Sequence, residues 1–220
     1  MLLLYKSISM EKIIEEEIHK LNSINDEVKL VWKANMDAGN GIFLFDFFVL
    51  PLLNKVFNIN RAYISLIEDN NFIAAGTLVR IQLDVLLRVF ASTIIGYNVD
   101  EFAKKLLSGE QLNNMKDSRG NLMRDGYLAK ELNNYEDFNW VKYAYDKGNL
   151  YVHLTPHSLY SSSKLDDNER NIVLTIGPND SFVSDDEKYA ATMIMNQITS
   201  GILHFVSIWI LHKVESKKDD

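Results

Sequence analysis

Hydrophobic residues recur at intervals of three and four along most of the chain, which is the spacing of one face of an α-helix. This pattern predicts helices over residues 9–21 and 26–37, with acidic residues on the outer face of the first. Residues 42–57 are strongly apolar and contain Pro51, so we expect a buried helix that is kinked or interrupted near the proline.

The longest uninterrupted apolar pattern covers residues 71–95 and predicts a central helix that packs on several neighbours. Ser184 and Glu187 have the spacing of a capping box, which indicates the start of a final helix that runs to about Val214. Shorter patterns predict three more helices, at residues 99–107, 127–135 and 138–152.

Irregular segments separate these helices. Residues 108–126 and 158–183 are polar and predict loop-rich connections, and residues 171–176 form the one strand-like run, which either pairs with itself across a dimer or stays extended. Glycine and proline together are about 6% of the chain, roughly half the usual share, which argues against many short strands. The sequence predicts one all-α domain over residues 1–220, a helical bundle of five to seven helices with at most one short strand.

Composition removes several classes of function. The chain has no cysteine, which excludes disulfides, thiolate metal sites and cysteine nucleophiles. Its formal net charge of −7 argues against broad electrostatic capture of nucleic acid, although a local basic pocket is compatible with it. Residues 190–211 are long enough to span a membrane but include polar side chains, so we expect a buried core helix there. The start of the chain lacks the pattern of a secretory signal, and a cytoplasmic protein is expected.

Three charged residues lie on one face of the predicted central helix. Arg80, Asp84 and Arg88 are four residues apart, and their charges sum to +1. Ionised groups removed from water cost several kcal/mol each unless they are paired, so this stripe needs a further anion. Asp46, isolated among phenylalanines, is a candidate that would close a structural network of two arginines and two aspartates. The alternative is a pocket in which the arginines hold a phosphate or carboxylate ligand.

A second concentration of polar side chains occupies residues 151–160. His153 and His157 have the spacing of a helical metal site, but Pro156 makes a continuous helix through both improbable, so neither a metal nor another cofactor is expected. One interpretation makes His153 an acid/base group beside Tyr151, with His157 contributing to ligand binding. The other makes the histidine a helix cap and the tyrosine a core residue.

Parts of residues 64–158 resemble an uncharacterised group of bacterial all-α proteins related to the HEPN superfamily, many members of which serve phage defence or toxin–antitoxin systems. The segments that carry the resemblance are Leu78-Val79-Arg80 to Leu87-Arg88-Val89, Met123-Arg124-Asp125-Gly126-Tyr127-Leu128 and Tyr151-Val152-His153. HEPN ribonucleases have an arginine four to six residues before a histidine, usually completed across a dimer. This chain lacks an arginine at that distance from His153 or His157, so the resemblance implies RNA cleavage only if Arg80 or Arg88 meets His153 in space.

Two hypotheses follow. In the first, the chain is a HEPN-like defence or stress protein that binds RNA or a nucleotide, with Arg80 and Arg88 holding phosphate and His153 acting as a metal-independent acid/base. In the second, it is a non-catalytic helical module that binds a partner protein or forms a homodimer, and the arginine–aspartate stripe is structural.

Overall fold

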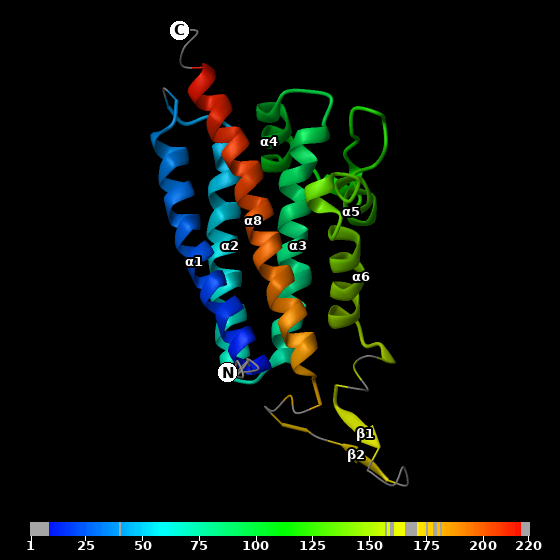
Figure 1. Ribbon diagram of the computed structural model, residues 1–220. Coiled ribbons are helices and arrows are strands. Elements are labelled where there is room, and N and C mark those ends of the chain that lie inside the picture. Colours follow the sequence, from blue (N-terminus) through cyan, green and yellow to red (C-terminus); the bar gives the residue numbers. More distant parts are fainter. Residues whose placement is uncertain are drawn as a thin grey trace, which may run out of the picture.

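Four long helices lie side by side in the computed structural model and form the body of the molecule (Figure 1). They are α1 (Met10–Asp37), α2 (Asp46–Glu68), α3 (Phe72–Ile94) and α8 (Asp185–Ser216). Both α2 and α8 pack against α1 and α3, which closes the arrangement around one hydrophobic core. The structure describes residues 9–39, 41–156, 158, 161–165, 171–174, 176–177, 180 and 182–216.

Three shorter helices cover α3 and the neighbouring end of α2. The helix α6 (Val141–Val152) packs along α3, α5 (Asp125–Leu132) packs against α3 and α6, and α4 (Val99–Leu107) contacts α2 and α3. Single 3-10 turns, η1 (Leu112–Asn114) and η2 (Glu136–Phe138), lie before and after α5. The prediction of an all-α bundle is confirmed, and α3 has the bounds expected of the central helix, with the Asn71 side chain accepting a hydrogen bond from the Ala74 N–H as its cap.

Two expectations about the first helices were wrong. The patterns at 9–21 and 26–37 belong to one helix, α1, because the residues between them include no glycine or proline and Ile24 and Asn25 face the core. The helix predicted at 42–57 begins at Asp46 and ends at Glu68, and it is not interrupted at Pro51. Pro51 lies in the second turn of α2, where the helix loses a single backbone hydrogen bond.

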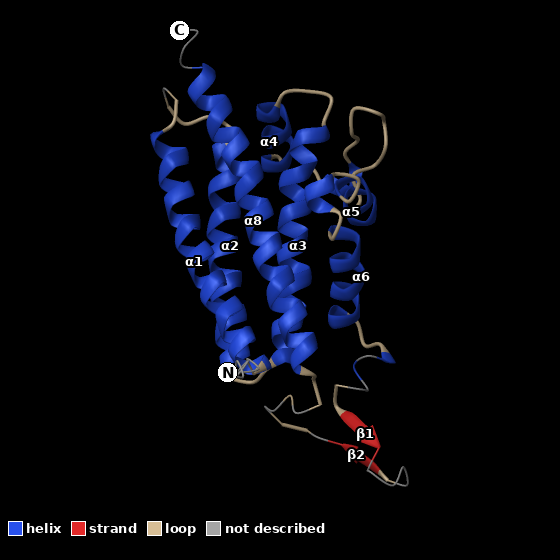
Figure 2. Ribbon diagram, in the orientation of Figure 1, coloured by secondary structure: helices blue, strands red, loops and turns tan. Residues whose placement is uncertain are grey.

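The strand-like run was assigned to the correct segment, but it has a partner within the chain. β1 (Ser163–Leu165) pairs antiparallel with β2 (Ile172–Leu174), with Lys164 opposite Val173. β1 is three residues long and has no hydrophobic alternation, so it gave no signal in the sequence. This hairpin extends beyond one end of the bundle (Figure 2), and β2 is exposed along its whole length.

A layer of buried amides and a hydroxyl joins all four long helices. The Gln82 side-chain amide donates to the Asn60 Oδ1 and to the Thr199 hydroxyl, at 3.1 and 3.3 Å, and the Asn60 amide donates to Asn25. These residues come from α3, α2, α8 and α1 respectively and are at most 5% exposed. Because a shift of any helix would leave buried polar groups unpaired, this layer fixes the register of the bundle.

Within the described chain, α8 alone is long and apolar enough to cross a membrane by length and composition. In the bundle, 56% of its most apolar stretch is buried, against α1 and α3. The core helix of a bundle passes the same test, so the length and apolar character of α8 fit both a membrane-spanning helix and a buried helix of the bundle.

Candidate functional site

Arg80, the first residue of the α3 stripe, is largely enclosed by protein. Arg80 forms an ion pair with Asp84, its Nε donates to the Asn149 Oδ1 at 3.1 Å, and its Nη2 lies 3.5 Å from the Asp125 carboxylate. Its guanidinium also stacks over the Tyr145 ring, 4.6 Å from the ring centroid. With 11% of its side chain exposed, Arg80 has its charge balanced and its surface covered by these neighbours.

This enclosure depends on a glycine in α6. A Cβ atom at Gly148 would lie 3.0 Å from the Arg80 Cβ and Cδ and 3.3 Å from its Cα. The absence of a side chain therefore lets α6 approach α3 closely enough for Tyr145 and Asn149, on neighbouring turns, to contact the same guanidinium.

Arg88, one end of the stripe, is far less constrained. Its side chain is 41% exposed, and its one polar contact among the described residues joins Nη1 to the Asp125 Oδ1 at 3.4 Å. Two arginines and the two aspartates, Asp84 and Asp125, make the network formally neutral. The expected balance of two cations and two anions is present, but the second anion comes from α5.

Asp46 is not that second anion, and the pairing expected for it was wrong. The Asp46 carboxylate accepts hydrogen bonds from Lys213 at 2.8 Å, Trp209 at 2.8 Å, Asn35 at 3.0 Å and the Phe43 backbone at 2.9 Å. Burial raises the pKa of Asp46, but these hydrogen bonds outweigh it and lower the pKa below its ordinary value. The group joins α1, α2 and α8 at the end of the bundle and has a structural role.

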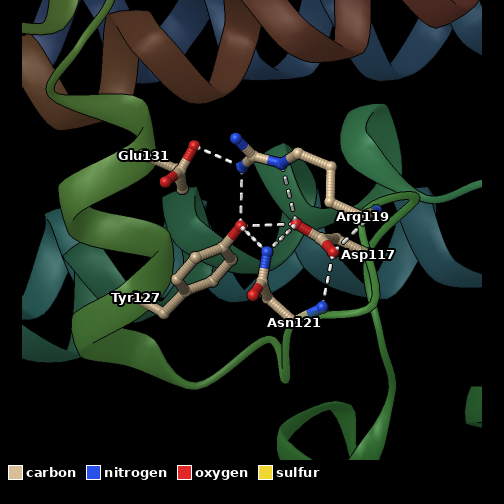
Figure 3. Close-up of polar contacts among 5 residues, drawn as sticks. All are labelled: Asp117, Arg119, Asn121, Tyr127 and Glu131. Atoms are coloured by element: carbon tan, nitrogen blue, oxygen red, sulfur yellow. Dashed lines mark hydrogen bonds and ion pairs between the residues drawn. The ribbon is translucent and has the colours of Figure 1, made fainter.

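A compact polar cluster holds the loop that leads to α5 (Figure 3). It consists of Asp117, Arg119, Asn121, Tyr127 and Glu131. The Asp117 carboxylate accepts from the Tyr127 hydroxyl and from the backbone N–H groups of Arg119 and Asn121 at 2.9 and 2.8 Å. Arg119 completes the cluster by donating to Tyr127 and Glu131 on α5.

This cluster, which we call the Asp117 clamp, places Asp125. It fixes the loop to α5, and the Ser118 N–H bonds to the Ile94 carbonyl at the end of α3. Asp125, the first residue of α5, is thereby brought between Arg80 and Arg88. The sequence predicted only a loop-rich connection over residues 108–126 and did not predict this cluster. The local signal was Asp117 followed by Gly120, whose φ of 87° forms a tight turn.

The Asp117 clamp shifts the pKa values of two of its own residues, Asp117 and Tyr127. Burial would raise the pKa of Asp117, but hydrogen bonds from Tyr127, Asn121 and the Arg119 backbone lower it to about 2. Burial and the bond to Asp117 raise the pKa of Tyr127 in turn. The carboxylate is therefore ionised, and the phenol neutral, throughout the physiological range.

Tyr151 is a packed residue on α6. Its ring meets Phe72 edge-on, with centroids 5.6 Å apart, and lies against Gly76, where a Cβ would be 3.1 Å from the ring. Burial and then a hydrogen bond with the Glu187 carboxylate raise the pKa of the Tyr151 phenol. This hydroxyl joins α6 to the first turn of α8.

The structure does not bring His153 to the arginines. His153 ends α6, its backbone N–H bonds to the Asn149 carbonyl, and its side chain is exposed beside a hollow of about 410 Å³ that Tyr151 also lines. No hydrogen bond joins its ring to Arg80 or Arg88 in the part of the chain that the structure describes. His157 lies outside the described residues.

Arg88 borders an apolar depression formed by α2, α3 and α4, which we call the Arg88 groove. A hollow of about 360 Å³ lies beside a second of about 260 Å³, and the two share the lining residues Phe48, Arg88 and Leu106. Lys55 and Asp84 lie at the first hollow, and Asp84 is neutralised by Arg80. The remaining lining of the first hollow is apolar: Phe47, Pro51, Leu52, Ile81, Val85, Ala103 and Leu107.

Comparison of the chain with family models, with curated proteins and with solved structures finds no match. Among the described residues, no group of three or more histidine, aspartate or glutamate side chains is placed to hold a metal ion.

Proposed function

We propose that this protein is a non-catalytic helical binding protein whose Arg88 groove holds an amphiphile with one anionic head group. The observation that carries this proposal is the contrast between the two arginines. Arg80 has its hydrogen-bonding groups directed at protein partners, whereas Arg88 has one long contact and lines both hollows, the larger of which is mainly apolar.

The head group is the part of the ligand that Arg88 recognises. A guanidinium presents five N–H donors in a planar fork that matches carboxylate and phosphate oxygens. The single 3.4 Å contact with Asp125 leaves most of the Arg88 donors for a ligand, and Lys55 adds a second positive charge to the same hollow. A carboxylate and a phosphate share this chemistry and are both compatible with the groove.

The apolar part of the ligand would fill the hollows. At about 360 Å³ the larger one is within the usual range of small-molecule sites, and aromatic and aliphatic side chains form most of its wall. Removing a methylene group from water contributes about 0.8 kcal/mol, so affinity should rise about fourfold for each added carbon until the hollow is filled. In this proposal Arg80 and Asp84 position α3, and Asp125 holds Arg88 towards the groove.

The test is calorimetric titration of the purified chain with hexanoate, octanoate, decanoate and dodecanoate, each below its micelle concentration. Octyl phosphate is the second anionic ligand, and octanol is the neutral control ligand. We expect affinity to increase with chain length, and octanoate or octyl phosphate to bind at least about tenfold more tightly than octanol, since hydrogen bonds to charged groups contribute about 1.5–3 kcal/mol.

Arg88→Met keeps the apolar stem and removes the charge, so it should abolish the preference for the anions while octanol binding is unchanged. Arg61→Met, on the exposed face of α2, is the matched control and should behave as the wild type. Equal binding of octanoate and octanol to the wild type, or the same loss in both variants, would contradict the proposal.

A further inference from the structure

The smaller hollow of the Arg88 groove has a different lining from the larger one. Its volume is about 260 Å³, and beyond the residues that both hollows share it is lined by Phe102, Gln111, Leu112 and Asn113. Phe102 and Leu112 are buried and apolar. The side-chain amides of Gln111 and Asn113 have no counterpart at the larger hollow, which no amide side chain lines. A ligand that fills both hollows therefore needs a polar part as well as an apolar part.

The two amides are open to such a ligand. Gln111 and Asn113 are exposed, and neither side chain has a hydrogen bond to another residue in the described part of the chain. Each side-chain amide offers two N–H donors and a carbonyl acceptor. Another carboxamide matches this set, since it donates through its nitrogen and accepts through its oxygen. The polar part that suits the smaller hollow is therefore a neutral amide.

The turn that carries these amides is ordered without a ligand. Leu112 is 7% exposed and packs into the hydrophobic core. The Asn114 N–H donates to the Gln111 carbonyl at 2.9 Å within the turn that contains η1. The Phe48 ring meets Phe102 edge-on, with centroids 5.7 Å apart, and both rings line the same hollow. Little conformational freedom of the backbone would be lost on binding, which favours affinity.

The position of Arg88 decides the shape of the ligand. Arg88 lines both hollows, so a molecule that fills the two must branch next to its anionic group. A straight-chain fatty acid extends in one direction from its carboxylate and fills one hollow only. An amino acid with an acyl chain on its nitrogen has the required branch, because its α-carbon carries the carboxylate, the acylated nitrogen and the side chain.

We propose that the Arg88 groove binds an N-acyl amino acid whose side chain ends in a neutral amide, as in an N-acylglutamine. This inference rests on the proposed function, because it uses the same arginine and places the acyl chain in the same larger hollow. Arg88 holds the carboxylate, and the side-chain amide of the ligand bonds to Gln111 and Asn113. With three different groups of one chiral carbon held, the mirror image of the ligand can place only two of them at once.

The experiment is calorimetric titration of the full chain with octanoate, N-octanoylglycine and both enantiomers of N-octanoylglutamine. N-octanoylglycine is the reference, because it has the acyl chain and the carboxylate but no side chain. We expect one glutamine enantiomer to bind at least about fivefold more tightly than N-octanoylglycine and than its own mirror image, a factor within reach of one or two neutral hydrogen bonds. The enantiomers have the same charge and apolar surface, so a difference between them reports on the placement of the side chain.

A double variant, Gln111→Ala with Asn113→Ala, removes both amides from exposed positions. In this variant the better glutamine enantiomer should bind no more tightly than N-octanoylglycine, and the melting temperature should stay unchanged. Asn134→Ala, at an exposed position that follows α5, is the matched control and should keep the preference of the wild type.

Octanoate separates this inference from the proposed function. If octanoate binds but the glutamine enantiomers and N-octanoylglycine have equal affinities, or if the preference survives in the double variant, this inference is overturned and the proposed function stands. If neither octanoate nor any of the acyl amino acids binds, both are overturned.

Discussion

Asp46 and Arg88 show how differently two isolated charges can be used. The Asp46 carboxylate accepts hydrogen bonds from four donors and joins three helices, so removal of any donor would leave a buried charge with one hydrogen bond fewer. Arg88 has one weak partner and stands at an apolar surface. The sequence identified both residues as unusual, because each is charged within an apolar segment. The sequence could not identify the partners of either residue. Lys213, for example, lies 167 positions from Asp46.

The Asp117 clamp predicts an acid-sensitive component of stability. The pKa of Asp117 is about 2 in the folded chain and about 3.9 in an unfolded chain. Since the folded pKa is the lower one, the stabilisation by Asp117 is fully present above about pH 4 and is lost as the pH falls towards 2.

Tyr127→Phe removes the hydroxyl that donates to Asp117, so we expect the pKa of Asp117 in the folded chain to rise. The acid-dependent loss of stability should then be smaller and should be complete at a higher pH. The measurement is the melting temperature as a function of pH between 2 and 7. Tyr143→Phe, on the exposed side of α6, is the control and should follow the wild-type curve. Coincident curves for wild type and Tyr127→Phe would contradict this assignment.

At the scale of elements, the sequence predicted which segments are helical better than it predicted which helices pack against each other. The apolar pattern placed the start of α3 and the capping box at Ser184 placed the start of α8, because both are local signals. The position of α5 relative to α3 is decided by Asp125, whose partners lie 37 and 45 positions away. Contacts over such distances in sequence leave no local pattern, so the sequence predicted only a polar connection at residues 108–126.

The close approach of α6 to α3 gives a prediction for Gly148→Ala. Alanine favours a helix over glycine by about 1 kcal/mol, but the added Cβ would press on the Arg80 backbone at 3.3 Å. Overpacking of this kind costs about 1–3 kcal/mol, so we expect a net loss of stability of about 1 kcal/mol in urea unfolding.

Gly126→Ala is the matched control, because a Cβ there would meet the Tyr145 hydroxyl at an ordinary 3.6 Å. It should be neutral or slightly stabilising. A Gly148→Ala protein that is more stable than the wild type would show that α6 moves away from Arg80 freely, and would remove the steric explanation for the glycine.

At the scale of the whole molecule, the bundle is divided by buried polar groups into regions with different roles. The amide layer at Asn60 and Gln82 fixes the register of the four long helices, and the Asp46 group holds one end of the bundle. The overall class was accessible from the sequence because periodicity reports on burial. The positions of these buried polar groups could not be predicted from the sequence, because they depend on which helices pack together.

The separation of His153 from the arginines gives a prediction about RNA cleavage. The ribonuclease hypothesis needs His153 beside an arginine, but Arg80 is balanced by Asp84 and Asp125, and His153 borders a different hollow. The net charge of −7 adds no general attraction for a phosphate backbone. We therefore expect neither the wild type nor His153→Ala to cleave single-stranded or structured RNA.

The measurement is incubation of both proteins with labelled RNA at low salt, where electrostatic binding is strongest, followed by electrophoresis. Arg80→Met should also leave RNA unchanged, and because it breaks the network with Asp125 it should lower the melting temperature, whereas His153→Ala should not. Cleavage by the wild type that disappears in His153→Ala would revive the catalytic hypothesis. It would require His153 and an arginine to meet in an arrangement, such as a dimer, that a single chain does not form.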